Sequence, residues 1–377
     1  MRKFGINSIH LSIVTLIAVS ILSTQFTLVD GWKGTHWLMS YEFDFIKRGM
    51  IGSVTQYFFP LPISLEQISL LSYSIYFVLS IALVAYILPA FKNDIILITL
   101  LLASGFSLQQ LGYDIGRHDQ AVLLITLLSL TLITKYKNNL AILTTSLITL
   151  SAFSMLIHEA SALIAVPLIF SALSISTLKL KQGYASPFFY LASSICIFII
   201  IIVLGAPSVS AESWVDFLKQ RSAFEVNLNA AAVTHNSLKD NITISMTRLI
   251  SSATANRMAL ILFFSIAYFY AIYKIIQIQL CNEQNIILFF TSLPAIATLP
   301  LFFLGLDYYR WIAIAMLNTL LLLTFIRYTT DAKPIDLSKK ALCFLTLFTL
   351  YTGPLGISIA LPDRLMLLKN IHALIPI

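Results

Sequence analysis

Residues 188–206 read FFYLASSICIFIIIIVLGA, a run in which no side chain is charged. A bilayer core requires about 20 consecutive apolar residues in one helix, so this run alone predicts a membrane-spanning helix. Only helices satisfy every backbone group in hydrocarbon without closing a barrel. We therefore predict an all-α, polytopic transmembrane helix bundle of about eleven spans, because ten further apolar runs occur at residues 6–26, 68–91, 95–111, 120–134, 140–157, 160–178, 258–273, 286–304, 312–326 and 341–361.

The composition of the 377-residue chain excludes a soluble enzyme. Hydrophobic residues make up 58% of the chain and charged residues only 11%, whereas soluble domains carry about 25% charged residues. The net charge of +7 comes without a basic cluster interleaved with aromatic residues, so we expect no nucleic-acid partner. Cys196, Cys281 and Cys343 lack any paired spacing, which argues against a disulfide framework and against a zinc site. We expect neither a metal nor a cofactor.

The distribution of lysine and arginine predicts the orientation of the chain. These residues are denser in the short loops that become cytoplasmic when the N-terminus is inside, so the positive-inside rule places the N-terminus in the cytoplasm. With eleven spans the C-terminus lies outside, and two long outer loops cover residues of about 27–67 and 207–257. We interpret residues 6–26 as an uncleaved first span rather than a signal peptide. We treat residues 1–377 as a single integral-membrane domain, although one long, kinked segment at 140–178 would change the span count.

The first outer loop contains the stretch YEFDFIKRGMIGS at residues 41–53. Two carboxylates, Glu42 and Asp44, alternate with aromatic residues, and Arg48 follows shortly after. An arginine guanidinium matches the geometry of phosphate oxygens, so Arg48 is a candidate for binding a lipid phosphate. The alternative is an interfacial anchor in which Lys47 and Arg48 extend to the lipid headgroups.

The second outer turn reads GYDIGRHDQ at residues 112–120. This turn carries more ionisable groups than a simple connector between two apolar spans needs. They are Asp114, Arg117, His118 and Asp119. A carboxylate there could orient Arg117 or act as a base, and the alternative is a turn whose charges pair internally.

His158 and Glu159 interrupt an otherwise apolar region. Ionisable residues in such places are costly and usually face a bundle interior or a watery cavity. A carboxylate partly removed from water can serve as an acid or a base. The alternative is a helix-end pair that forms a salt bridge with a neighbour.

Two further outer segments carry candidate residues. Asp307 and Arg310 lie three residues apart in the stretch DYYRW, so on a helix they share a face. They could line a cavity in which the aromatic rings stack on a sugar, or the stretch could be an aromatic belt at the membrane edge. The loop at 207–257 is long enough to act as a lid or to hold an acceptor, and it carries Arg221.

Three classes of function compete. A transporter places its polar residues near the bilayer midplane, often on broken helices, whereas here the charges gather at predicted outer helix ends. A purely structural membrane protein has no need for arginine–carboxylate clusters on one face. An enzyme that acts on a lipid-anchored substrate needs this layout, with arginines at the phosphates and a carboxylate or histidine at the acceptor hydroxyl.

The size, the number of spans and the outer loops resemble those of bacterial Wzy-type O-antigen and capsule polymerases. One long loop after the first span and another after the seventh also resemble the layout of GT-C-type integral-membrane glycosyltransferases. The chain lacks the arginine followed eleven positions later by glycine that is found in part of the polymerase family. The GT-C resemblance implies a catalytic acidic residue in the first outer loop, where Glu42 and Asp44 lie.

From these patterns we expect a polymerase of the bacterial inner membrane that joins lipid-linked oligosaccharide repeats at the periplasmic face. The alternatives are a GT-C-type transferase that adds one sugar from a polyprenyl phosphate donor and a glycolipid flippase or exporter. Expected partners are a polyprenyl-pyrophosphate-linked oligosaccharide, membrane lipid, and a chain-length regulator or flippase. The candidate catalytic residues are Asp119, Glu159, Asp44, Glu42 and His158. The candidate pyrophosphate- and sugar-binding residues are Arg48, Arg117, His118, Asp114, Asp307, Arg310 and Arg221.

Overall fold

The computed structural model describes residues 6–24, 26–42, 44–136, 139–280, 285–329, 334–335, 337–356 and 365–374. Over these residues the chain is all-helical, and the only β-pairing is an isolated parallel bridge between Ile63 and Ser222. Seven of the described helices are long and apolar enough to cross a membrane. This agrees with the predicted multi-pass helical protein, while the count of eleven spans and the orientation stay predictions.

The chain divides into two compact units, each assembled from separate stretches of sequence. Unit 1 comprises Met1–Gln25, Ser80–Asp114 and Ile242–Ile377, and unit 2 comprises Phe26–Leu79 and Ile115–Asn241. The helices of unit 1 are α1 (Ile6–Leu22), α5 (Ile95–Leu102), α6 (Leu108–Tyr113), α14 (Ser252–Leu280), α15 (Asn285–Ile296), α16 (Leu301–Leu304), α17 (Tyr308–Thr329), α18 (Lys339–Thr352) and α19 (Met366–Leu374). The helices of unit 2 are α2 (Gly31–Trp37), α3 (Gly49–Phe58), α7 (Asp119–Lys135), α8 (Leu140–Ile157), α9 (Ser161–Lys179), α10 (Ala185–Leu204), α11 (Ala211–Gln220) and α12 (Leu228–Ala232). The chain passes between the units four times: after Gln25, within α4 (Leu65–Ala90), after Asp114 and within α13 (Leu238–Leu249).

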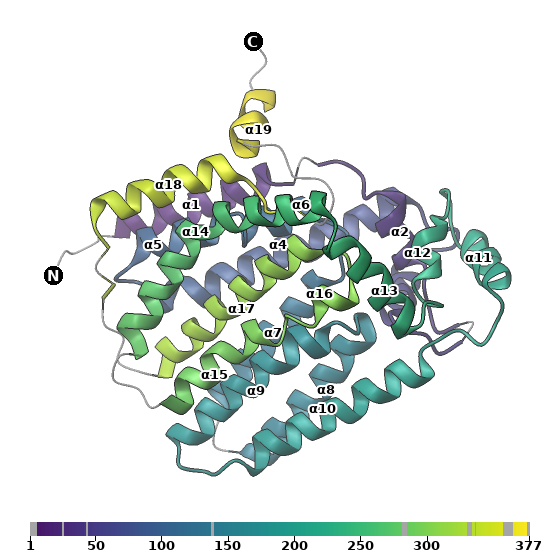
Figure 1. Cartoon of the computed structure of the whole chain (residues 1–377), viewed down its shortest axis with the longest axis horizontal. Helices are drawn as coiled ribbons and strands as arrows, with labels where there is room; N and C mark the ends of the chain where they lie inside the picture. The colour runs from purple at the N-terminus through teal and green to yellow at the C-terminus, as the bar shows by residue number, and fades with distance from the viewer. Residues whose placement is uncertain are drawn as a thin grey trace. The chain divides into compact units, whose positions relative to one another are not determined.

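Unit 2 is built around one buried helix. The most apolar window of α9 is 78% buried, whereas that of α10 is only 22% buried. Helices α7, α8 and α10 each pack against α9 (Figure 1). The outer face of α10 carries exposed side chains such as Ile199 and Val203, which suit contact with lipid.

The two predicted outer loops are folded, and their unit 2 parts pack together. Helix α2 contacts α12, and α11 contacts α12 (Figure 1). Helix α2 also contacts α3, which reaches the membrane-type helix α8. The bridge at Ile63 reinforces this assembly: its N–H donates to the Arg221 carbonyl at 2.8 Å, and its carbonyl accepts from the Ala223 N–H at 2.9 Å. We call α2, α3, α11, α12 and their connecting segments the loop cap.

Unit 1 is also built around one buried helix, α17, whose apolar window is 78% buried. Helices α14, α15 and α16 pack against α17, while α1 packs against α5, α6 and α19. The predicted continuous span at residues 95–111 is wrong, because α5 and α6 are separate short helices. At the break, a Cβ on Gly105 would lie 2.1 Å from the Gly353 carbonyl oxygen, so the chain needs glycine for this close approach.

Three other predicted spans correspond to helices of 17 residues or fewer. The run at 6–26 contains α1, of 17 residues, and the run at 341–361 overlaps α18, of 14 residues, with residues 357–361 outside the described ones. The run at 120–134 lies within the 17 residues of α7 and is extended by one residue at each end. The region 140–178, where one long kinked segment was the alternative, is two helices that pack against each other, α8 and α9.

Candidate functional site

The break between α8 and α9 places two ionisable residues at a helix junction. Helix α8 ends at Ile157, and His158 adopts an extended backbone with φ −155° and ψ 116°. The His158 Nδ1 accepts a hydrogen bond from the Ala160 N–H at 3.2 Å. In a neutral ring the proton therefore sits on Nε2. Glu159 follows directly, and its side chain is largely buried.

Glu159 is paired with Arg48, which comes from the loop cap immediately before α3. The Arg48 Nε lies 2.8 Å from Oε2 and 3.1 Å from Oε1 of Glu159, and Nη2 also donates to Oε1. Arg48 has a left-handed backbone with φ 67°, a conformation that costs a non-glycine residue on the order of 1–3 kcal/mol. Burial alone would raise the pKa of Glu159, but Arg48 and then His158 outweigh it and hold this pKa well below its usual value.

A second carboxylate approaches His158 from α7. The His158 Nε2 lies 3.9 Å from Oδ1 of Asp119, while its Nδ1 lies 3.4 Å from Oε2 of Glu159. Asp119 is the first residue of α7 and is buried. The positive end of a helix dipole favours a carboxylate at that position. One imidazole therefore lies between two carboxylates, with Nε2 towards Asp119.

Two further buried histidines extend this arrangement. The ring centroids of His118 and His158 are 6.4 Å apart, and those of His36 and His118 are 6.2 Å apart. Among the described residues, neither ring nitrogen of His36 has a hydrogen-bond partner, and the same holds for Nε2 of His118. Burial first, and then positive neighbours that include Arg48 and Arg117, lower the pKa of both His36 and His118 well below 6.5. Both rings are therefore neutral at pH 7.

Aromatic residues of α2 hold the turn that carries Arg117 and His118. The Arg117 guanidinium lies over the Trp32 ring, 4.3 Å from its centroid, which is cation–π geometry. The Trp37 Nε1 donates to the Gly116 carbonyl at 2.8 Å. Gly116 has φ +93°, which only glycine adopts without strain. The turn is thus fixed against α2.

We call these seven residues of unit 2 the histidine–arginine cluster: Arg48, Arg117, His118, Asp119, His158, Glu159 and His36. It combines guanidinium groups that suit phosphate oxygens with a carboxylate–imidazole pair suited to proton transfer. Sequence analysis singled out six of the seven, and the structure brings these six together from three separate stretches. His36 was missed, because tryptophans such as Trp32 and Trp37 are ordinary at a membrane interface and do not mark the histidine between them.

The remaining predicted residues of unit 2 lie in the loop cap and not in the cluster. Arg221 is buried, where its Nε donates to the Leu38 carbonyl at 3.1 Å and its Nη1 pairs with Glu42. The Glu42 side chain is 58% exposed. Asp44 accepts from the Ser208 N–H at 2.8 Å, and this hydrogen bond lowers the pKa of Asp44. Arg221 and Asp44 therefore join the two predicted outer loops.

The other three predicted residues belong to unit 1. Arg310 lies 2.7 Å from Asp307 and 3.9 Å from Asp114. The role of Asp114, Asp307 and Arg310 in binding pyrophosphate or sugar stays a prediction. The guanidinium also lies 4.3 Å from the centroid of the Trp311 ring. Tyr308 and Trp311 are buried in the structure.

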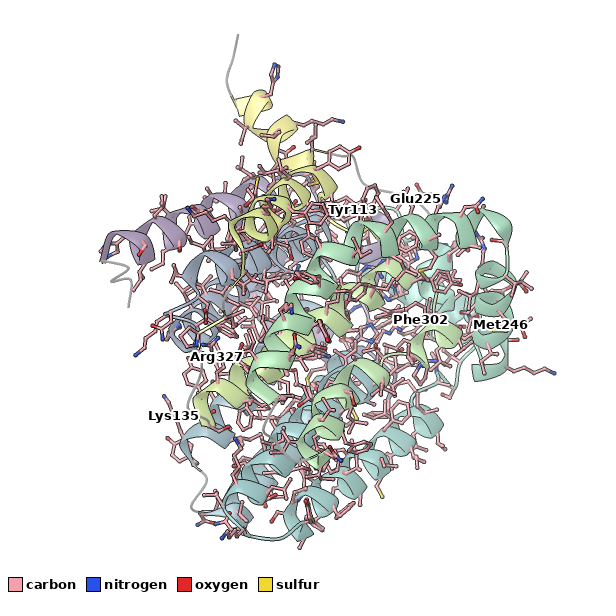
Figure 2. All side chains as sticks on the ribbon, turned by 60° about the vertical axis from the view of Figure 1, so that its left-hand side comes forward. Tyr113, Lys135, Glu225, Met246, Phe302 and Arg327 are labelled. Atoms are coloured by element: carbon pink, nitrogen blue, oxygen red, sulfur yellow. The ribbon has the colours of Figure 1, made fainter. Side chains whose placement is uncertain are left out.

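Unit 1 contains a buried ion pair that sequence analysis missed. Nη1 of Arg327, in the last turn of α17 (Figure 2), lies 2.8 Å from Oδ2 of Asp94. Asp94 also accepts from the Ile335 N–H at 2.7 Å, and the Phe91 ring centroid lies 4.3 Å from the guanidinium carbon. Nothing in the local sequence pairs Arg327 with Asp94, because the two residues lie far apart along the chain.

Among the described residues, no three His, Cys, Asp or Glu side chains are grouped so that they could hold a metal ion.

Comparison of the chain with protein-family models, with curated proteins and with solved structures finds no match.

Proposed function

We propose that this protein transfers glycosyl groups from a polyprenyl-diphosphate-linked donor at the extracytoplasmic face of a bacterial inner membrane, joining lipid-linked oligosaccharide repeats. The observation that carries the proposal is the histidine–arginine cluster, where two arginines and a carboxylate–imidazole pair meet. These are the two kinds of group that glycosyl transfer from a diphosphate requires. The loop cap contributes His36 and Arg48 to the cluster, and its other residues would cover a bound sugar.

The chemistry divides between the two ends of the cluster. An acceptor hydroxyl attacks the anomeric carbon of the donor, forming the new glycosidic bond, and the bond from that carbon to the diphosphate oxygen breaks. Asp119, oriented by His158, accepts the hydroxyl proton. Arg48 and Arg117 stabilise the negative charge that remains on the departing diphosphate.

The positions of the charges favour an enzyme over a transporter or flippase. Arg48 precedes α3, Asp119 is the first residue of α7, and Glu159 lies between α8 and α9. All three stand at helix ends beside folded loops, whereas transporter sites are built within broken membrane helices near the midplane.

A single-sugar transferase is the second candidate, and one observation favours it. The exposed carboxylate of Glu42 lies in the first predicted outer loop, where the GT-C resemblance implies a catalytic acid, and Arg221 holds it in place. In that case the donor is a polyprenyl phosphate that carries one sugar.

The glycolipid profile of a strain that lacks the gene tests the proposal. Loss of the long glycan ladder, with one complete repeat remaining on its carrier or acceptor, supports the polymerase. A repeat that lacks one sugar supports the single-sugar transferase, and complete repeats stranded on the cytoplasmic side support a flippase. An unchanged profile contradicts all three.

Complementation with variants then tests the cluster itself. Arg117→Ala and Asp119→Asn are expected to reach the membrane in normal amounts and to restore no glycan. A general base contributes about 10²–10⁴-fold to a rate. The Asp119→Asn variant should therefore produce almost no glycan ladder on a gel. Lys219→Ala, on the exposed face of α11, is the matched control and restores the ladder. Full activity of Arg117→Ala contradicts the role of the cluster.

A further inference from the structure

Helix α3 of the loop cap buries one face and exposes another. The buried stripe has helical spacing and consists of Ile51, Gly52 and Thr55. The opposite stripe continues past the end of α3, and its exposed apolar side chains are Val54, Tyr57, Phe58 and Leu61. Tyr57 is 91% exposed and Phe58 is 63% exposed. We call these four exposed side chains the aromatic tip.

The packing of α3 keeps the aromatic tip outward. A Cβ on Gly52 would lie 2.0 Å from the Met39 carbonyl oxygen, so the buried face of α3 is in close contact with the backbone after α2. Beyond the tip, Ile63 is held by its two hydrogen bonds to the Arg221 and Ala223 backbone. The helix therefore cannot turn its exposed face inward. Adjacent apolar side chains exposed in this way mark a contact with a protein or a membrane.

The distribution of charge on the loop cap favours a membrane. Residues 49–65 contain no charged side chain. By contrast, α11 exposes both Asp216 and Lys219. One helix of the loop cap thus suits water, whereas the other offers only apolar and uncharged polar groups. Protein-binding surfaces have a polar rim around their apolar centre, whereas uncharged aromatic segments suit the headgroup level of a bilayer.

The aromatic tip is also continuous with a candidate membrane span. Helix α4 begins at Leu65, four residues after Leu61, and its side chains Leu70 and Val78 are exposed. At about 1.5 Å per residue, the 26 residues of α4 extend about 39 Å. This length is close to the thickness of a bilayer with its headgroups, about 40–45 Å. The start of α4 therefore lies at headgroup level, and the tip directly precedes it.

We propose that the aromatic tip inserts into the lipid surface on the loop-cap side of the membrane and holds the loop cap against it. This inference is independent of the proposed function. Arg48, at the other end of α3, is engaged with Glu159, so apolar side chains make the lipid contact. Phe58 lies about 15 Å along α3 from Arg48. The histidine–arginine cluster accordingly lies within one short helix of the lipid surface.

Spin labelling of the full-length protein in phosphatidylcholine–phosphatidylglycerol nanodiscs tests this inference. Single labels are introduced as Tyr57→Cys and Phe58→Cys. The natural cysteines, replaced by serine in this background, are Cys196, Cys281 and Cys343. Electron paramagnetic resonance then measures the accessibility of each label to oxygen, which concentrates in lipid, and to a nickel chelate, which stays in water. We expect the ratio of oxygen to nickel accessibility at both positions to exceed severalfold that of a label in water.

Two matched positions calibrate the measurement. Lys219→Cys, on the charged face of α11, represents water, and Ile199→Cys, on exposed α10, represents lipid. Val54→Cys and Leu61→Cys provide further labels, so the test does not depend on the folding of one variant.

Two results overturn the inference. The first is a nickel accessibility at the tip equal to that of Lys219→Cys, because the tip is then in water. The second is protection of the tip from both reagents, because a second copy of the chain or another protein then covers it. Neither result bears on the proposed function, which the glycolipid profiles test separately.

Discussion

Each unit contains a buried arginine–carboxylate pair, and the two pairs have different surroundings. In the Asp94–Arg327 pair of unit 1 the side chains of Arg327 and Asp94 are 1% and 2% exposed. The Ile335 N–H and the Phe91 ring complete that environment. In the Arg48–Glu159 pair of unit 2 the corresponding values are 14% and 17%, and histidines and a second carboxylate lie alongside.

The comparison shows that a buried ion pair is not by itself a functional site. Asp94 and Arg327 bind each other, the backbone and an aromatic ring, so the pair ties α17 to the start of α5 and to Ile335. Glu159 contacts a titratable neighbour, His158, which in turn approaches Asp119. We therefore assign a structural role to the first pair and chemistry to the second, and the predictions below test this division.

The largest loss of stability is expected from Asp94→Ala. Removal of one partner from a buried pair leaves an uncompensated charge and costs about 3–5 kcal/mol. The unfolding temperature in detergent is expected to fall steeply. Asp94→Leu combined with Arg327→Met should recover most of the stability and full glycan synthesis. A double variant that is folded but inactive would place Asp94 and Arg327 in the function and contradict the structural role.

Glu159→Gln is expected to have a smaller effect on stability and a larger one on activity. The amide retains an acceptor for Arg48 but no charge, so the loss is about 1.5–3 kcal/mol, typical of a hydrogen bond to a charged group. Glycan synthesis is expected to fail, because Arg48 and His158 both lose their carboxylate partner. Replacing both members, Arg48→Leu with Glu159→Leu, should restore the unfolding temperature without restoring glycan. If this double variant is active, the contrast between the two pairs disappears.

The buried histidines predict a pH dependence that belongs to unit 2. The pKa values of His36 and His118 are lowered in the folded protein from 6.5, so below pH 6.5 the unfolded chain binds protons more readily than the folded one. Stability is therefore complete above about 6.5 and is lost as the pH falls towards the folded pKa values. The unfolding temperature is expected to drop between pH 7.5 and pH 5.5, and His36→Leu should reduce this drop. An unchanged pH dependence in His36→Leu would show that His36 is not buried as a neutral ring.

The helices that sequence could predict are those in which the apolar pattern alone decides the structure. Residues 188–206 carry no charge and form α10 almost as expected. The run at 95–111 also carries no charge, but Gly105 admits the Gly353 carbonyl from a distant stretch, and a hydropathy pattern does not report such a contact. Similarly, the sequence shows His158 as an interruption of an apolar run. It does not show the extended backbone of His158, which separates α8 from α9.

The site was predictable as a set of residue types and not as an assembly. Arg48 was singled out because its guanidinium matches phosphate oxygens, His118 because its turn is dense in ionisable groups, and Glu159 because ionisable groups are costly beside apolar runs. Nothing in their spacing distinguished them from Asp307 and Arg310, which lie in the other unit. The distances that make the distinction are set by packing of α3, α7, α8 and α9. A buried histidine such as His36 gives no periodic signal in a short loop helix.

The smallest effect is expected at an exposed pair, which provides the reference for both buried ones. Lys219 and Asp216 lie 3.3 Å apart on α11, with side chains 60% and 68% exposed. Water screens such charges, and pairs of this kind contribute about 0.5 kcal/mol or less. Asp216→Ala should therefore leave both the unfolding temperature and the glycan ladder unchanged, at low and at high salt alike. A loss comparable to that of Glu159→Gln would mean that α11 is docked on a ligand or on another surface through Asp216, and burial would then no longer explain the difference between the pairs.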